Sequence, residues 1–117
     1  ETTTAIENLD EILAGDGVDG VFIGPSDLAA SMGYIGDAGN PVVVDTIKQG
    51  LSKIKAAGKW GGLLCLDPSM AQEYIEAGAS FVGVGVDSMI LANETRKLAQ
   101  KFKGGAEPVS DKPQASY

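Results

Sequence analysis

The sequence predicts an α/β fold with parallel strands, and three observations support this. Helical and strand patterns alternate along residues 1–103. The strand segments are short and almost continuously apolar, as expected for strands covered on both faces. Glycine or proline stands at most boundaries between the segments. Such an alternation builds right-handed βαβ units, in which neighbouring strands run parallel.

Two arrangements of these units are open. One is a small doubly wound sheet, and the other is the C-terminal part of a (β/α)8 TIM barrel. The chain starts at Glu1 rather than at methionine, and it enters a helical pattern at once. This favours the barrel and predicts that a segment precedes Glu1. We expect residues 1–103 to form the C-terminal βα units of a single barrel domain, and residues 104–117 to form a flexible tail or arm.

Apolar periodicity and breaker residues set the expected bounds of the elements. Strands are expected over 18–24, 61–66 and 81–86, and helices over 4–13, 41–57, 68–77 and 88–103, with a short helical turn over 25–32. Asp67 is the expected N-cap of the helix that starts at Pro68. The helix over 41–57 has one apolar stripe: Val43, Ile47, Leu51 and Ile54. The last helix carries a comparable stripe: Leu91, Thr95, Leu98 and Phe102.

Composition excludes several classes of partner. Nine basic and sixteen acidic residues give a net charge of −7 without a lysine or arginine stripe, so no nucleic-acid partner is expected. No apolar run reaches the length of a membrane span and no signal-peptide pattern occurs, so we expect a cytoplasmic protein without a membrane partner. The lone cysteine, Cys65, lies in an apolar run, which favours a buried structural thiol over a reactive one.

In parallel α/β folds, the residues just past the carboxyl ends of the strands face the active site. Three such segments occur here: 24–27, 64–67 and 85–87. Asp27 follows a strand and a proline, so the amides of Ser26 and Asp27 open a helix, where they predict an anion site. Gly24 lets a ligand approach the backbone closely. The alternative, that Asp27 only caps its helical turn, is equally open on spacing alone.

The sequence also excludes some kinds of chemistry. It contains no histidine, so neither a histidine general base nor a histidine-ligated zinc site can come from these residues. Lys59 precedes its strand, and the other lysines lie on helices or in the tail, which disfavours a Schiff-base aldolase. The segment Gly83-Val84-Gly85 lacks the third glycine of a dinucleotide-binding loop, and close packing explains it better.

The run GVDGVFIGPSDL, from Gly17 to Leu28 and continuing to Met32-Gly33-Tyr34, resembles the signature of the HpcH/HpaI family of metal-dependent pyruvate aldolases. The similarity extends without an obvious gap from Glu1-Thr2 through Gly62-Leu63-Leu64 to the segment 81–87. It therefore covers nearly the whole chain apart from the tail. The resemblance implies a barrel of the phosphoenolpyruvate/pyruvate type.

The resemblance implies a metal site built from two carboxylates. In the family, the glutamate of a Gln-Ile-Glu-Thr segment binds the metal, and Glu1-Thr2 would be the end of that segment. The second ligand is the aspartate of a Gly-Pro-x-Asp-Leu motif, here Asp27. Two oxygen ligands, completed by water and substrate, suit Mg²⁺, Mn²⁺ or Co²⁺. The implied substrate-binding residues are Gly24, Ser26, Asp27 and Leu64, with the substrate carboxylate on the amides of Ser26 and Asp27.

The implied activity is that of a class II aldolase, a carbon–carbon lyase. It would cleave a 4-hydroxy-2-oxo acid or a 2-oxo-3-deoxy sugar acid to pyruvate and an aldehyde through a metal-stabilised pyruvate enolate. The family's arginine, histidine and glutamine lie upstream, so this chain carries no catalytic residue beyond the metal ligands and should be inactive alone. The family also implies a homo-oligomer with the helix from Ser88 to Phe102 at an interface. Two alternatives stay open: a citrate-lyase-like acyl lyase of the same superfamily, and a non-catalytic Mg²⁺-binding α/β module.

Overall fold

The structure is a computed structural model that describes residues 1–103 of the 117. The predicted tail over 104–117 lies outside the described residues. Residues 1–84 form one compact unit, which holds the sheet and five helices, and the segment that begins at Gly85 forms a second unit with a single long helix. Within residues 1–103, none of the helices combines the length and the apolar character that a membrane span requires.

The sheet has three parallel strands in the order β1-β2-β3: β1 (Gly20–Ile23), β2 (Trp60–Leu64) and β3 (Phe81–Gly83). In its register Ile23 lies beside Leu63, and Leu64 lies beside Gly83. The predicted parallel α/β fold is confirmed. Each strand is shorter than the apolar run that predicted it, because pairing with a neighbouring strand, and not apolar character, defines where a strand ends.

Five helices complete the first unit: α1 (Thr3–Glu7), α2 (Leu9–Ala14), α3 (Pro25–Ser31), α4 (Pro41–Ala56) and α5 (Pro68–Glu76). The prediction of one helix over 4–13 is wrong, because the chain leaves helical geometry at Asn8, with φ −91° and ψ 13°. Asparagine competes with the helical backbone for hydrogen bonds, so it often stands at a helix end. Leu9 and Leu13, which follow the break, are both buried.

Two helices begin at a side-chain cap followed by proline. Asn40 Oδ1 accepts a hydrogen bond from Val42 N at 3.1 Å at the start of α4. Asp67 Oδ1 accepts from Ser69 N at 2.8 Å and from Met70 N at 3.0 Å at the start of α5, so the predicted N-cap is confirmed. The Ser69 hydroxyl and these two amides hold the pKa of the Asp67 carboxyl below its usual value.

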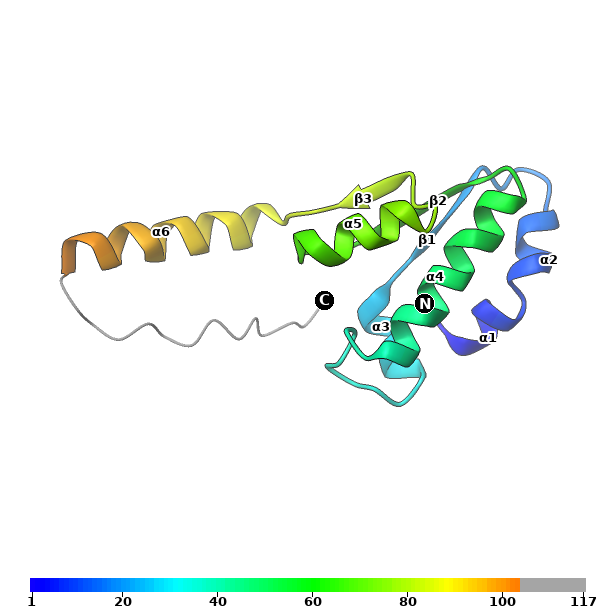
Figure 1. The fold of residues 1–117 in the computed structure, drawn as a ribbon, viewed down its shortest axis with the longest axis horizontal. Coiled ribbons are helices and arrows are strands. Elements are labelled where there is room, and N and C mark those ends of the chain that lie inside the picture. Colours follow the sequence, from blue (N-terminus) through cyan, green and yellow to red (C-terminus); the bar gives the residue numbers. More distant parts are fainter. Residues whose placement is uncertain (104–117) are drawn as a thin grey trace. The chain divides into compact units, whose positions relative to one another are not determined.

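The core of the first unit lies between α4 and the sheet, and Figure 1 shows α4 lying over β1. The predicted stripe of α4 is buried, with each of its residues 0% exposed: Val43, Ile47, Leu51 and Ile54. Ile23 and Leu63 contribute to the same core from the sheet. α4 comes so close to β2 that a Cβ on Gly61 would lie 3.0 Å from Leu51 Cδ2. Each buried side chain of this size contributes about 1.5–3 kcal/mol, so the stripe is a main source of stability.

The opposite face of the sheet is apolar and open. Phe22 on β1 and Phe81 on β3 are 50% and 68% exposed, and their ring centroids lie 6.1 Å apart on either side of Gly62. Val21 and Val82, their neighbours in the same strands, pack on the core, as alternation along a strand requires. Among the described residues, therefore, helices cover one face of the sheet. One-sided cover and sequential strand order are typical of a barrel wall, whereas a doubly wound sheet carries helices on both faces.

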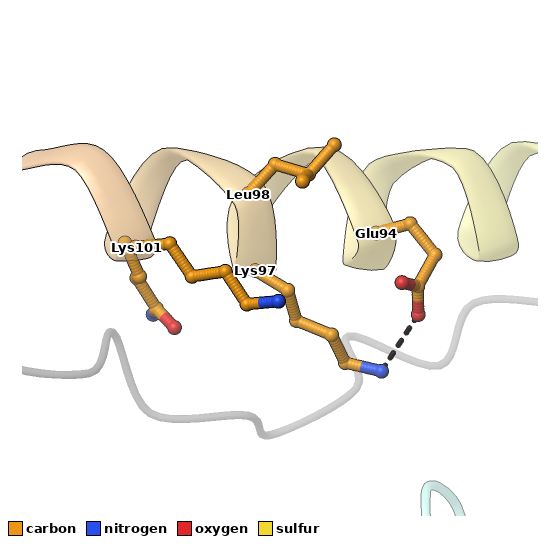
Figure 2. A pocket seen from close by; sticks show the side chains of 5 residues that line it. Glu94, Lys97, Leu98 and Lys101 are labelled. Carbon is orange, nitrogen blue, oxygen red and sulfur yellow. Dashed lines mark hydrogen bonds and ion pairs between the residues drawn. The ribbon is translucent and has the colours of Figure 1, made fainter.

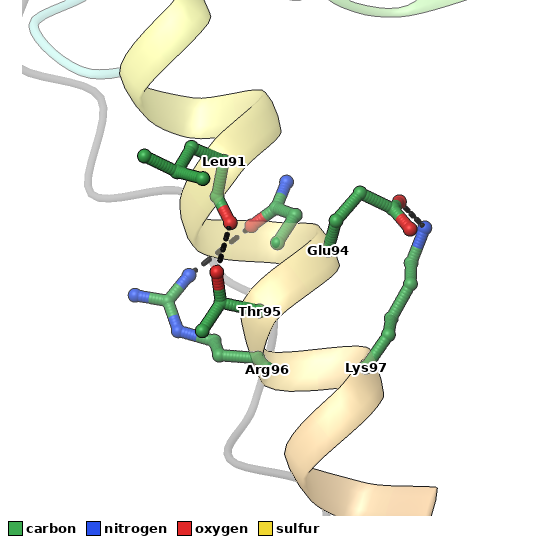
Figure 3. A network of polar contacts seen from close by, with 6 residues as sticks. Leu91, Glu94, Thr95, Arg96 and Lys97 are labelled. Atoms are coloured by element: carbon green, nitrogen blue, oxygen red, sulfur yellow. Dashed lines mark hydrogen bonds and ion pairs between the residues drawn. The ribbon is translucent and has the colours of Figure 1, made fainter.

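The second unit consists of α6 (Asp87–Lys103), and none of its described residues is buried. Polar contacts link neighbouring turns of this helix: Thr95 Oγ1 donates to Leu91 O at 2.6 Å, and Lys97 Nζ lies 2.7 Å from a Glu94 oxygen (Figure 3). Leu91 and Phe102 of the predicted stripe are 70% and 86% exposed. Among the described residues of its own unit, the stripe thus forms an apolar surface without a partner.

Alanine substitutions at two adjacent valines test how much the burial of α4 contributes to stability. Val43 is fully buried and Val42 is 51% exposed, and both lie in the first turn of the helix. We expect Val43→Ala to lower the free energy of unfolding by about 2 kcal/mol, because it removes buried methyl groups and leaves a cavity. Val42→Ala is the matched control and should change it by less than about 0.5 kcal/mol. Urea denaturation followed by circular dichroism measures both, and equal losses would contradict this packing.

Tyr74 of α5 predicts how stability changes at high pH. Burial of its side chain, reinforced by the nearby Cys65 and Glu73, raises the pKa of Tyr74 to about 12. In the unfolded chain the pKa is about 10, so between these values the unfolded state holds fewer protons. We expect the free energy of unfolding to fall as the pH rises through this window. Urea titrations at about pH 9 and about pH 11 measure this decrease in the free energy of unfolding, and Tyr74→Phe should make the decrease smaller. An equal decrease in the variant would mean that other groups cause the pH dependence.

Candidate functional site

The carboxyl ends of β1 and β2 meet at one edge of the sheet. Because the register pairs Ile23 with Leu63, the residues that follow them reach this edge side by side. They are Gly24 and Leu64, two of the predicted substrate-binding residues. Gly24 is also the N-cap residue of α3, with φ −91° and ψ 102°, and Pro25 opens the helix directly after it. One predicted substrate-binding residue from β1 and one from β2 therefore lie side by side at the carboxyl edge of the sheet.

Glu1 and Asp27 converge on Gly24. A Cβ added to Gly24 would lie 3.1 Å from Glu1 Cγ, 3.2 Å from Glu1 Oε1 and 3.3 Å from Asp27 Oδ2. One oxygen of each carboxylate is therefore close to the same point beside the backbone. The structure brings the two predicted metal-ligating side chains together, although they are far apart in the sequence. The absence of a side chain at Gly24 leaves room for both.

The donor set at Gly24 fits a hard divalent cation. Within residues 1–103, neither the Glu1 nor the Asp27 carboxylate forms a hydrogen bond or an ion pair. Two neighbouring anionic oxygens repel each other, and a cation between them removes this repulsion. In the part of the chain that the structure describes, no cluster of three or more His, Cys, Asp or Glu side chains could hold a metal ion. Two carboxylates with an otherwise open shell are a set with which Mg²⁺ binds together with water and substrate.

Asp27 does not cap its helix. It is the third residue of α3, and no side-chain hydrogen bond caps that helix. The first backbone bond of the helix runs from Leu28 N to Gly24 O at 2.9 Å, so the amides of Ser26 and Asp27 precede the helical ladder. The alternative in which Asp27 is only a cap is therefore wrong. Binding of a substrate carboxylate to these two amides stays a prediction.

The sequence did not predict one hydrogen-bonded contact near this edge, between Thr3 and Ser31. Thr3 N donates to Ser31 Oγ at 3.0 Å, and Thr3 Oγ1 lies 3.4 Å from the same oxygen. Ser31 ends α3 four positions after Asp27, and residues with this spacing share a face of a helix. The spacing is visible in the sequence. The partner, Thr3, becomes apparent only when the chain is folded.

Cys65 lies just past the end of β2 and is half-buried against the core, so the thiol is less covered than the buried thiol that the sequence predicted. Its amide still donates to Gly83 O at 2.8 Å, but Leu64 is the last residue of β2, so Cys65 lies at the margin of the sheet. The thiol lies 3.5 Å from Asp67 O, as a donor to that carbonyl. Burial raises the pKa of the Cys65 thiol above its usual value. A thiol that holds its proton is a poor nucleophile, which agrees with a structural role.

A shallow depression on α6 offers no comparable site. Figure 2 shows side chains that line it, all of them from one helix: Glu94, Lys97, Leu98, Gln100 and Lys101. Glu94 and Lys97 already pair with each other at 2.7 Å. Among the described residues, only this helix lines the depression, and side chains from one helix do not enclose a small molecule as a concave pocket does. The carboxyl edge of the sheet is therefore the stronger candidate.

Comparison with known proteins identifies the family. The sequence profile of the family described as HpcH/HpaI aldolase/citrate lyase matches residues 1–94. The chain belongs to this family. The matched region contains the whole sheet and both carboxylates that converge on Gly24.

Three relatives indicate how much of a family member this chain represents. It is 50% identical over 119 residues to the hydroxypyruvate/pyruvate aldolase of Cupriavidus necator, covering 100% of this chain and 44% of that protein. It is 51% identical over 109 residues to the 2-keto-3-deoxy-L-rhamnonate aldolase of Klebsiella pneumoniae subsp. pneumoniae, covering 92% and 41%. A crystal structure of an HpcH/HpaI aldolase/citrate lyase family protein from Burkholderia cenocepacia J2315 matches with a TM-score of 0.82 and 35% identity, over 89% of this chain and 40% of that one. The chain thus spans about two-fifths of the length of these relatives.

Gly24→Ala tests the convergence of the two carboxylates. Alanine tolerates the backbone angles of Gly24, but its methyl group would press on Glu1 and Asp27. We expect the substitution to weaken Mn²⁺ binding about tenfold, as other disturbances of ligand orientation do. Gly39→Ala is the matched control, because a Cβ there meets open space. Electron paramagnetic resonance titration with Mn²⁺ measures both variants. Equal affinities would mean that the space at Gly24 has no role in binding.

Proposed function

We propose that this chain is the metal-binding part of a divalent-metal-dependent aldolase. The enzyme cleaves a 4-hydroxy-2-oxo acid or a 2-oxo-3-deoxy sugar acid to pyruvate and an aldehyde. The observation that supports this most strongly is the convergence of Glu1 and Asp27 on Gly24. Membership of the HpcH/HpaI family supports the reaction class, as do relatives named as aldolases of hydroxypyruvate or pyruvate and of 2-keto-3-deoxy-L-rhamnonate.

In this proposal each residue at the edge has a separate role. Glu1 and Asp27 hold the ion, which is Mg²⁺, Mn²⁺ or Co²⁺. When bound, the ion supplies Lewis-acid stabilisation of the negative charge that develops as the carbon–carbon bond breaks. Gly24 leaves space for a ligand beside the backbone, and the amides of Ser26 and Asp27 orient the substrate carboxylate. Leu64 offers an apolar side chain beside them and excludes water from the apolar part of the substrate.

In this proposal, the arginine and the histidine that the family resemblance implies come from outside this chain. The sequence has no histidine, and its one arginine, Arg96, donates to Asn93 within α6. A carboxylate that holds a metal is not free to act as the proton donor. We therefore expect the chain alone to bind a metal ion without turning over substrate.

The open face of the sheet supports completion of the fold by a longer protein. Phe22 and Phe81 are exposed on that face, and β1 and β3 are unpaired edge strands within the described residues. Further parallel strands would cover the face and pair both edges, giving a TIM barrel to which residues 1–103 contribute as one domain. A homo-oligomer with α6 at an interface belongs to the same proposal. The exposed Leu91 and Phe102 support it.

The central test removes first the metal and then one ligand from the complete protein. We expect pyruvate release from a 4-hydroxy-2-oxo acid, followed with lactate dehydrogenase, to stop in EDTA and to return with Mg²⁺ or Mn²⁺. Asp27→Asn keeps the size of the side chain and removes its charge, so metal affinity and turnover should fall more than about 100-fold, beyond the usual effect of an outer contact. Asp16→Asn, at an exposed position outside the site, is the matched control.

Each of the other readings gives a different result in this test. Full activity in EDTA would contradict the metal-dependent mechanism. Unchanged metal affinity in Asp27→Asn would remove Asp27 from the site. A citrate-lyase-like enzyme, which the family description also includes, would cleave an acyl substrate and release no pyruvate from the oxo acid. A non-catalytic module would bind the ion and release no pyruvate from any of these substrates.

A further inference from the structure

The segment that carries Glu1 contacts α3 at two points. Glu1 and Asp27 meet beside Gly24. Two residues after Glu1, Thr3 N donates to Ser31 Oγ at 3.0 Å, and Thr3 Oγ1 lies 3.4 Å from the same oxygen. Asp27 and Ser31 are four positions apart in α3 and therefore lie one turn apart on one face. Both contacts thus use the same side of α3.

The Thr3 amide needs an acceptor from outside its own helix. Thr3 is the first residue of α1, and amides in the first turn of a helix have no intrahelical acceptor. The N-cap residue, Thr2, accepts a different amide, that of Ala5, through its hydroxyl at 3.1 Å. Ser31 supplies the acceptor for Thr3, and in doing so it ties α1 to α3.

Packing alone holds this part of the chain weakly. None of the residues of α1 is fully buried, although the partly exposed Ile6 packs against the core, and the first buried side chain after it is Leu9 in α2. Thr2 is extended, with φ −120° and ψ 157°, so Glu1 lies outside the helix. A segment with few buried contacts opens at low cost in free energy. The hydrogen bond at Thr3 is therefore well placed to limit the positions that Glu1 can take.

We propose that Ser31 is a positioning residue, whose hydroxyl holds the Thr3 backbone so that the Glu1 carboxylate stays beside Asp27. Ser31 itself touches neither metal nor substrate. The inference rests on the proposed function, in which Glu1 and Asp27 share one divalent ion. A serine hydroxyl suits this role because it accepts from the Thr3 amide while its own proton remains available to the Thr3 hydroxyl. Contacts that orient metal ligands in this way typically change metal affinity about 10- to 100-fold.

The test uses the complete protein and two readouts other than activity. Ser31→Ala removes the acceptor, so we expect Mn²⁺ to bind about tenfold more weakly in a paramagnetic resonance titration and the Thr3 amide to exchange its hydrogen faster. Ser31→Thr keeps a hydroxyl and should restore both. Ser52→Ala is the matched control, because Ser52 is another exposed serine bonded to backbone, with its hydroxyl 3.4 Å from Ala77 O. If Ser31→Ala does not fold, Ser31→Cys, with a weaker acceptor, takes its place in the same titration.

The outcomes separate the role of Ser31 from the metal site itself. Unchanged Mn²⁺ affinity in Glu1→Gln and Asp27→Asn would overturn the proposed function. Large losses in those two variants with normal affinity in Ser31→Ala would overturn the role of Ser31 and leave the metal site in place. A loss in Ser31→Ala that Ser31→Thr does not restore, or that Ser52→Ala reproduces, would assign the effect to general destabilisation and also overturn the inference.

Discussion

The apolar stripe of α4 packs against β1 and β2 so closely that a Cβ on Gly61 would press on Leu51, 3.0 Å from its Cδ2. Two strands alone do not form a stable sheet, and α4 stabilises β1 and β2 by packing on one face. It also fixes which residues reach the carboxyl edge, since sliding a strand by one position would turn its side chains to the opposite face. With Ile23 and Leu63 in the core, Gly24 and Leu64 must both arrive at the edge. The position of the candidate site thus depends on this packing.

The candidate site combines a rigid part with a weakly held part. Gly24 and Asp27 follow directly from β1, and the buried Leu28 and Ala29 anchor α3 against the core. Glu1 belongs instead to a segment whose own helix has no fully buried residue and packs on the core only through the partly buried Ile6. Two ligands of one ion must keep their relative positions to within a fraction of an ångström. In the proposed metal site, we therefore expect the hydrogen bond between Thr3 and Ser31 to matter more than a surface hydrogen bond ordinarily does.

The two faces of the sheet differ in how far they are covered. The face toward α4 is dry and closely packed, and it holds the unit together. The face with Phe22 and Phe81 is open and ends at the same edge as the carboxylates. An apolar surface of this kind usually marks a contact with further protein. The chain spans about two-fifths of the length of the relatives named above.

Periodicity and breaker residues encode local structure, so they were enough to predict the parallel α/β class, the buried stripe of α4, the cap at Asp67 and the place of Asp27 just past a strand. The sequence misplaced features that depend on neighbours in space: the break at Asn8, the lengths of the strands and the exposure of Cys65. Family resemblance, and not local pattern, marked Glu1. Two contacts became apparent only in the folded chain: Glu1 and Asp27 both lie against Gly24, and Ser31 accepts from Thr3. Those contacts join residues far apart in the chain, and no local pattern specifies the distance between them.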